Sequence, residues 1–230
     1  MPPAPPAARE IFGPALWQAE AYARLLAGPG VERGLIGPSE TARIWDRHLL
    51  NCAVVAELVP TPCALLDLGS GAGLPGIVLA MLLPRADVIL LEPMARRTVF
   101  LEECVRELGL TNARVVRGRA EELAGQIEAD VVTVRAVAAL DRLAVLASGL
   151  SRPGGLVLAI KGAKVAEELD RARPVLRRLG VTGVEVVAVG GGRIDPPATV
   201  VRFVAGRADR ETRRSSARRR AGERQEFGRA

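Results

Sequence analysis

Apolar positions in the first part of the chain recur with the spacing of helices. In residues 8–27 and again in residues 39–59, apolar side chains return every three to four positions, which predicts two amphipathic helices. The triplet Gly28-Pro29-Gly30 interrupts the pattern between them. Residues 1–8 are rich in proline and are expected to be disordered. Residues 1–60 are therefore predicted to form a helical extension.

From residue 61 onward the pattern changes to short apolar runs separated by amphipathic segments. The runs predict strands at residues 64–68, 87–91, 113–116, 130–134, 156–160, 184–189 and 199–204. The segments between them predict helices at residues 75–83, 95–108, around 121, 141–150 and 164–179, with Pro174 expected to kink or split the last one. Continuous apolar strands between helices indicate a mostly parallel sheet covered on both faces. The last two strands can close as an antiparallel pair, so residues 61–206 are predicted to form a Rossmann-like α/β domain.

The net charge of +6 is spread unevenly along the chain. Residues 207–230 hold nine arginines and four acidic residues, so this tail carries +5 and the body about +1. The apolar pattern also ends at Gly206, and the Arg-rich tail is expected to be disordered. A phosphate-binding face must therefore be a local cluster in the body or the tail itself, and the bulk charge is no proof of RNA binding.

The cysteine and histidine content argues against several kinds of site. The three cysteines form no CxxC pair, and their odd number argues against a disulfide framework. A single histidine leaves too few groups for a zinc site or a His-based triad. The chain does not open like a secretory signal, and no stretch reaches the roughly 18 apolar residues of a membrane span. We expect a cytoplasmic protein without a metal and without a membrane partner.

The strongest chemical motif is a glycine-rich turn after the first predicted strand. It reads Asp67-Leu68-Gly69-Ser70-Gly71-Ala72-Gly73-Leu74-Pro75-Gly76. Glycine lets the backbone turn tightly and approach a ligand, at the end of the sheet where doubly wound proteins bind nucleotides. The next helix is expected to offer free N–H groups to a carboxylate of that ligand. The residues of the motif that we assign to cofactor binding are Asp67, Gly69, Gly71 and Gly73.

Two classes of nucleotide cofactor compete for this turn. Gly71, Gly73 and Gly76 satisfy the GxGxxG spacing of dinucleotide-binding proteins. However, Asp67 stands where a dinucleotide fingerprint carries an apolar strand residue, and the closely spaced run that begins at Gly69 resembles motif I of class I methyltransferases. The pattern favours S-adenosylmethionine as the cofactor, with a dehydrogenase and a coincidental loop as the alternatives.

Two later segments fit the same nucleotide site. Glu92 ends the second predicted strand, about 20 residues past the glycines, where either nucleotide class places an acid that accepts the ribose hydroxyls. The alternative for Glu92 is a solvated acid at a strand end. Residues 118–122 follow the third strand, in the position that usually holds adenine, although their carboxylates also have a plain explanation as helix-capping groups.

Four segments within residues 40–162 carry a resemblance to a known family. They are Trp45-Asp46-Arg47-His48-Leu49-Leu50, the glycine-rich turn with its Gly73-Leu74-Pro75-Gly76 ending, Arg96-Arg97-Thr98-Val99-Phe100-Leu101 and Val134-Arg135-Ala136; Lys161-Gly162 fits as well. With these motifs the chain resembles the RsmG family, also called GidB, of guanine-N7 methyltransferases that act on small-subunit rRNA. This chain departs from the family pattern after the first of these motifs. The family has aspartate and serine after its Arg-His-Ile-Leu motif, whereas this chain has Asn51 and Cys52 at those positions.

The resemblance implies a class I methyltransferase fold with a seven-stranded sheet, S-adenosylmethionine as cofactor, and a guanine of 16S rRNA, at position 527 in standard numbering, as methyl acceptor. The substrate is then the small ribosomal subunit or an assembly intermediate, and the enzyme is expected to be a monomer. The positions that contact S-adenosylmethionine in the family are Gly69, Leu74, Ala120, Glu121 and Arg135.

The chemistry of this acceptor needs no obligatory catalytic residue. Guanine N7 has a free lone pair and loses no proton on attack, so positioning alone can supply ~7–11 kcal/mol. Arg135 and His48 are the candidates for a catalytic or orienting role. Basic residues for RNA phosphates, each also explicable as a solvated or paired surface charge, are Arg47, His48, Arg96, Arg97 and Lys161.

Two other functions remain open from the sequence. One is a methyltransferase for a small molecule or a protein, although no long insertion follows the fourth strand to enclose a small substrate. The other is a nucleotide-binding regulator without catalysis. The chain lacks an Asn/Asp-Pro-Pro-Tyr motif for an exocyclic amine and a suitably placed Pro-Cys nucleophile for a pyrimidine, which is consistent with N7 methylation.

Overall fold

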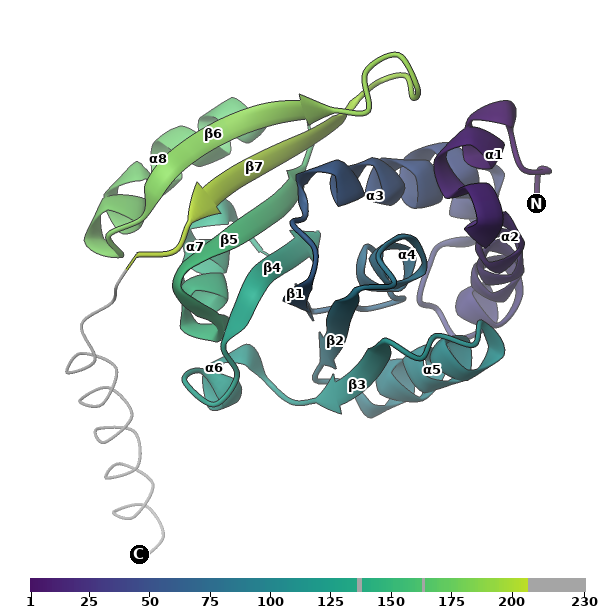
Figure 1. Cartoon of the computed structure of the whole chain (residues 1–230), viewed down its shortest axis with the longest axis horizontal. Helices are drawn as coiled ribbons and strands as arrows, with labels where there is room; N and C mark the ends of the chain where they lie inside the picture. The colour runs from purple at the N-terminus through teal and green to yellow at the C-terminus, as the bar shows by residue number, and fades with distance from the viewer. Residues whose placement is uncertain (136–137, 163, 207–230) are drawn as a thin grey trace, which may run out of the picture.

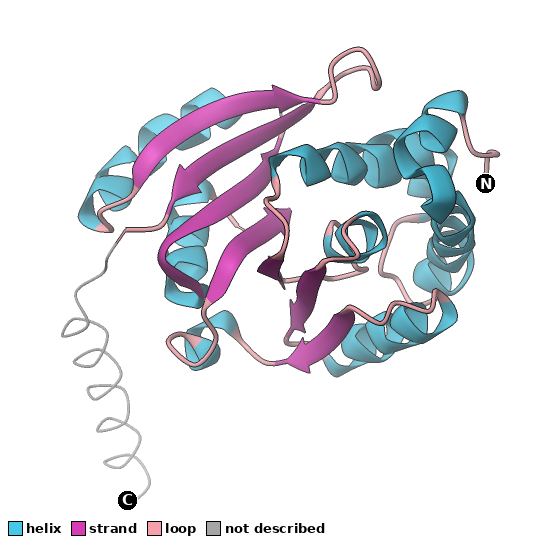
Figure 2. Ribbon diagram, in the orientation of Figure 1, coloured by secondary structure: helices cyan, strands magenta, loops and turns pink. Residues whose placement is uncertain are grey.

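The computed structural model describes residues 1–135, 138–162 and 164–206 (Figure 1). Seven strands form one sheet in the order β3-β2-β1-β4-β5-β7-β6 (Figure 2). Their bounds are Cys63–Leu68 (β1), Ala86–Glu92 (β2), Ala113–Arg117 (β3), Ala129–Arg135 (β4), Ser151–Lys161 (β5), Thr182–Val189 (β6) and Ala198–Val204 (β7). β1 to β5 pair in parallel, whereas β7 runs antiparallel to both β5 and β6. The predicted seven-stranded Rossmann-like sheet with an antiparallel last strand is confirmed.

Helices cover both faces of this sheet, as the apolar strands predict. Their bounds are Gly76–Leu82 (α4), Ala95–Glu107 (α5), Ala120–Leu123 (α6), Leu140–Leu150 (α7) and Val165–Arg178 (α8). Successive strand residues point to opposite faces, so Leu65 belongs to the core under α4 and α5, and Leu66 to the core under α7 and α8. α8 runs as one helix through Pro174, so the expected split does not occur.

Residues 6–58 form a series of short helical segments instead of two regular helices. The segments are α1 (Pro6–Phe12), α2 (Leu16–Leu25) and α3 (Asn51–Ala53), joined by 3₁₀ or π turns at residues 13–15, 26–30, 38–43, 44–50 and 54–58. Pro14, Pro29 and Pro38 lie in these irregular turns, because proline cannot donate the hydrogen bond that a continuous α-helix needs. The extension packs on the sheet face that carries α4 and α5 and shares its core.

The structure differs from the expectation that residues 1–8 are disordered. α1 begins at Pro6, because proline is preorganised for the first position of a helix, and Ala8 is fully buried. The Trp45 indole N–H also donates to the Pro2 carbonyl at 3.1 Å. The predicted disordered tail, residues 207–230, lies outside the described residues. Across the part of the chain that is described, no helix combines the length and apolar character needed to cross a bilayer.

Candidate functional site

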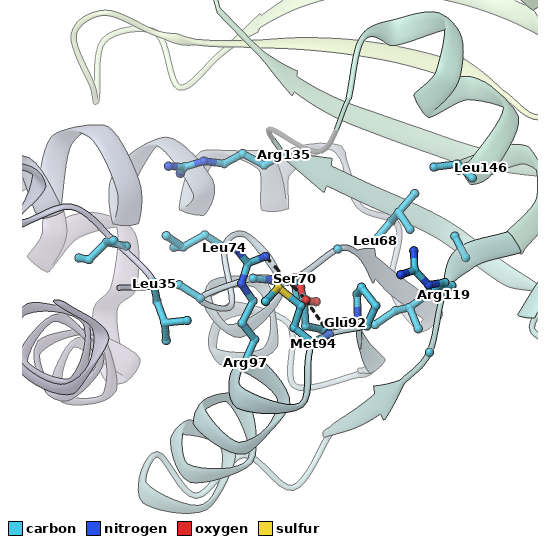
Figure 3. A pocket seen from close by; sticks show the side chains of 18 of the residues that line it. Leu35, Leu68, Ser70, Leu74, Glu92, Met94, Arg97, Arg119, Arg135 and Leu146 are labelled. Atoms are coloured by element: carbon cyan, nitrogen blue, oxygen red, sulfur yellow. Dashed lines mark hydrogen bonds and ion pairs between the residues drawn. The ribbon is translucent and has the colours of Figure 1, made fainter. Parts of the chain in front are cut away.

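A cavity of about 520 Å³ opens at the carboxyl ends of β1, β2, β3 and β4 (Figure 3). Residues 68–72, 74, 91–94 and 118–121 contribute most of its lining, because these segments lie at or follow the ends of parallel strands. The helical extension closes another side with Leu35, Ile36, Glu40 and His48. The cavity therefore lies at the edge of the sheet where doubly wound proteins bind nucleotides, and the extension is part of its wall.

The glycine-rich turn has the backbone conformation that its sequence predicts. Gly69, Gly71 and Gly73 have φ angles of 68°, 59° and 98°, a region that favours glycine over every other residue. A Cβ on Gly73 would lie 2.5 Å from Ile77 Cγ1 and 2.7 Å from the Tyr22 hydroxyl, so this glycine is also required for packing. Gly69 and Gly71 line the cavity and Gly73 does not, which places Gly73 behind the site that we expected it to contact.

A hydrogen bond from the extension holds the same turn. The Tyr22 hydroxyl of α2 donates to the Ala72 carbonyl at 2.6 Å, and the Tyr22 side chain is completely buried. Burial raises the pKa of Tyr22 well above its usual value, so the hydroxyl keeps its proton and acts as a donor. The conformation of the turn thus depends on a residue fifty positions earlier in the chain.

Asp67 supports the turn from inside the protein and does not line the cavity. Its Oδ2 accepts the Gly76 N–H at 3.0 Å, and its Oδ1 accepts the Thr133 hydroxyl at 3.1 Å. Burial raises the pKa of Asp67 to about 6. These hydrogen bonds fasten the turn to β1 and β4, and they place Asp67 behind the cavity wall where we expected it to contact the cofactor.

The first two N–H groups of α4, which we expected to be free for a ligand carboxylate, are bonded within the protein. The Gly76 N–H is bound by Asp67, and the Ile77 N–H donates to the Gly73 carbonyl at 2.8 Å. The sequence gives no sign of this arrangement, because it depends on the buried carboxylate reaching across the turn. These two N–H groups are therefore not available to a charged group of the ligand.

Glu92 lies at the end of β2 and lines the cavity although only 1% of its surface is exposed. Its Oε2 accepts the Gly71 N–H at 3.0 Å, and its Oε1 accepts the Met94 N–H at 3.1 Å. The Arg97 guanidinium lies 3.7 Å from Oε1 (Figure 3). Each carboxylate oxygen can accept a second hydrogen bond, so Glu92 has the capacity to bind two hydroxyl groups in the cavity.

The remaining lining combines apolar side chains with backbone amides. Leu68, Leu91 and Leu146 present apolar surface, and Ala120 and Glu121, at the start of α6, line the same cavity. Ala120 is only 8% exposed. An apolar slot beside a carboxylate and a polar turn fits a purine nucleoside, which has flat apolar faces and a hydroxylated sugar.

Arg135 ends β4 and connects the cavity to the extension through a chain of hydrogen bonds. Its guanidinium donates to Cys52 Sγ at 3.1 Å and to His48 Nδ1, while His48 Nε2 lies 2.8 Å from Glu40 Oε2. Because Nδ1 accepts, the imidazole proton is assigned to Nε2, which donates to Glu40. Burial, followed by the charge of Arg135, lowers the pKa of His48 to about 4, so this ring is neutral at pH 7.

The structure gathers most, but not all, of the predicted residues. The predicted residues that line the cavity are Gly69, Gly71, Leu74, Glu92, Ala120, Glu121, Arg135, His48 and Arg97. Arg96 is exposed and lines neither this cavity nor the one described next. Sequence reasoning missed Glu40, because an acid in an irregular polar segment gives no signal until His48 is placed beside it.

A second cavity, of about 870 Å³, adjoins the first, and Arg135 is the one described residue in both linings. Arg47 and Lys161 lie in this second cavity. The side chain of Lys161 is only 8% exposed, and its Nζ donates to the Ala138 carbonyl at 3.0 Å and to Glu168 Oε2 at 2.8 Å. Lys161 is thus tied to the protein and is less available to a phosphate than its sequence position indicates.

Comparisons with known proteins agree on one family. The family model GidB, described as rRNA small subunit methyltransferase G, matches residues 15–194. A Thermobifida fusca protein named ribosomal RNA small subunit methyltransferase G is 57% identical over 196 residues, which cover 85% of this chain and 83% of the relative. A Mycolicibacterium gilvum protein of the same name is 54% identical over 204 residues, covering 87% and 89%.

Solved structures agree on the fold. A SAM-dependent O-methyltransferase from Thermotoga maritima is similar with a TM-score of 0.57 and 13% sequence identity. The match covers 74% of this chain and 71% of that chain. At this identity the likeness concerns the class I methyltransferase fold alone.

Proposed function

The chain belongs to the GidB family of small-subunit rRNA methyltransferases, and from this premise we propose that it transfers a methyl group from S-adenosylmethionine to N7 of guanine 527 in 16S rRNA. The names of the relatives support the small-subunit rRNA as substrate. The resemblance of residues 40–162 to this family implies guanine N7 as the methyl acceptor. The site is consistent with this acceptor, and Arg135 and the neutral His48 are its candidate catalytic residues.

One observation carries the cofactor assignment. The almost fully buried Glu92 faces the cavity while it binds the N–H of Gly71 in the glycine-rich turn. Burying a carboxylate costs free energy of desolvation. For Glu92 this cost is offset by the N–H groups of Gly71 and Met94 and by the guanidinium of Arg97. Such an arrangement is typical of a preorganised acceptor for the ribose hydroxyls of a nucleoside.

The cofactor-binding residues that we propose fall into three groups. Glu92 would accept the ribose hydroxyls, Ala120 and Glu121 would hold the adenine, and Gly69 and Gly71 would let the ligand approach the backbone of the turn. Leu74 and Arg135 line the far side of the cavity, next to the extension. Asp67 and Gly73 would act indirectly, by fixing the turn from behind.

The proposed reaction depends on positioning more than on acid–base chemistry. When bound, S-adenosylmethionine supplies an electrophilic methyl group on a sulfonium sulfur. Guanine N7 attacks with a free lone pair and releases no proton, so no residue has to act as a base. The guanidinium of Arg135 lies between the two cavities and is held by Cys52 and His48, which suits it to orient an acceptor against the methyl group.

The structure also bears on the kind of acceptor. β4 ends at Arg135 and β5 begins at Ser151, so the connection, which contains α7, is too short to hold a long insertion that would enclose a small molecule. The site is also bordered by a second cavity, which gives room for neighbouring parts of a large substrate. Both features favour a polymer over a metabolite as the methyl acceptor. We propose that residues 61–206 form the methyltransferase domain and that the protein acts as a cytoplasmic monomer on the small subunit or its assembly intermediate.

The direct test is methyl transfer from labelled S-adenosylmethionine. Small subunits from cells that lack this modification, naked 16S rRNA and a metabolite extract would be compared as acceptors. We expect label in 16S rRNA as N7-methylguanine. Label confined to small molecules would establish the rival methyltransferase. S-adenosylmethionine binding in calorimetry without transfer to any RNA would instead favour the regulator.

A further inference from the structure

The second cavity differs from the rest of the described protein in its charge. Its lining contains six basic residues and three acidic ones: Arg43, Arg47, Arg135, Lys161, Lys164 and Arg171 against Asp46, Glu168 and Asp195. Residues 1–206 carry only about +1 in total. The lining thus has a net charge of +3 and the rest of residues 1–206 about −2, so a positive concave surface lies beside the cavity that we assign to the methyl donor.

The cations of this cavity are not equally available to a ligand. Lys161 is neutralised by Glu168, and Arg47 has Glu40 at 3.3 Å. Within the described residues, Arg43 and Lys164 form no ion pair, and both are exposed. Arg171 is exposed, and its Nε donates to the Glu167 carbonyl at 3.2 Å. Its ion pair with the Glu167 carboxylate is a loose surface pair at 3.7 Å, which a phosphate can replace at little cost.

The available cations stand on two different elements. Arg43 ends the turn at residues 38–43 of the extension, whereas Lys164 precedes α8 and Arg171 lies on its second turn. Because both elements contribute to the lining, the three side chains flank the same cavity from two sides. Two basic walls suit a polyanion that runs through the cavity better than a single small anion.

We propose that the second cavity binds the phosphates of the single-stranded RNA that flanks the acceptor nucleotide, through Arg43 on one wall and Lys164 and Arg171 on the other. The inference rests on the proposed function and names its RNA-binding surface. Arg135, which borders both cavities, then marks the point where the acceptor base meets the methyl donor. The volume of about 870 Å³ is in the range that holds a nucleotide.

The test measures RNA binding as a function of salt concentration with the full chain. An RNA oligonucleotide containing the target loop would be titrated into the wild type, Arg43→Gln and Lys164→Gln. Each lost phosphate contact on a single strand should reduce the log–log salt slope by about 0.7, while S-adenosylmethionine affinity stays unchanged. Arg85→Gln is the matched control, because Arg85 is exposed at the amino end of β2, on the opposite edge of the sheet.

The outcomes separate this inference from the proposed function. A reduced slope for Arg43→Gln and Lys164→Gln, but not for Arg85→Gln, supports the phosphate site. Slopes equal to that of the wild type for both cavity variants overturn it, even if the wild type methylates 16S rRNA. A wild type that methylates no rRNA overturns the proposed function, whatever the slopes.

Discussion

Glu92→Gln is the substitution that most directly probes the assigned cofactor site. Glutamine keeps the shape of the side chain but removes its charge and one of its two acceptor oxygens. The Gly71 and Met94 N–H groups, now at 3.0 and 3.1 Å from the carboxylate, then compete for a single acceptor. Both the glycine-rich turn and the proposed ribose hydroxyls lose a partner.

The expected size of the effect follows from the hydrogen bonds that are lost. Hydrogen bonds to a charged group contribute about 1.5–3 kcal/mol, which corresponds to a loss of affinity between about tenfold and about a hundredfold. Isothermal titration of S-adenosylmethionine into wild type and variant measures this change. Asp87→Asn is the matched control, because Asp87 is exposed near the other end of the same strand, and it should bind like the wild type.

A thermal unfolding curve for each variant shows whether the fold is retained. If Glu92→Gln is folded and binds S-adenosylmethionine with unchanged affinity, Glu92 does not contact the cofactor and the assignment of the cavity is wrong. If the variant is unfolded, Glu92→Asp provides the second measurement. Aspartate keeps the charge but shortens the reach, and it should weaken binding.

Three further predictions follow from other parts of the structure. Tyr22→Phe leaves the Ala72 carbonyl without its donor, and it should lower the free energy of unfolding by about 1–3 kcal/mol in urea titrations; an unchanged value would contradict the role of the hydroxyl. The pKa of Asp67 rises from 3.8 to about 6 on folding, so its contribution to stability is present below pH 4 and is lost as the pH rises to 6. The stability difference between wild type and Asp67→Asn should therefore fall over that interval, and a difference that rises would have the wrong sign. Deleting residues 207–230 should lower RNA affinity and its salt slope while S-adenosylmethionine binding is retained; equal RNA affinity would remove the tail from RNA binding.

Most of the fold could be predicted because it depends on side-chain periodicity. Short apolar runs identify six of the strands closely, namely the parallel strands β1 to β4 and the antiparallel strands β6 and β7. β5 is the exception, since it begins at Ser151 and not at residue 156. Residues 151–155 read Ser-Arg-Pro-Gly-Gly and hold no aliphatic or aromatic side chain, and Ser151 pairs with Ala129 across a register shift. Backbone pairing of that kind leaves no mark in the pattern of apolar residues.

The candidate site could be predicted only where one short segment determines the chemistry. The glycine-rich turn and Glu92 were recognisable because spacing along the chain reports on the ends of neighbouring strands. The inward role of Asp67, the burial of Lys161 and the part of Glu40 in orienting His48 all depend on partners far away in the sequence. Such partners are set by how the extension packs on the sheet, which no local motif encodes.

Mass-spectrometric mapping of modified guanines tests the central claim most directly. Small-subunit rRNA lacking this modification would be treated with the protein and S-adenosylmethionine, digested and compared with an untreated sample. We expect one new N7-methylguanine, at position 527 of 16S rRNA. A digest without any new methylguanine, or with the methyl group on another atom or nucleotide, would contradict it.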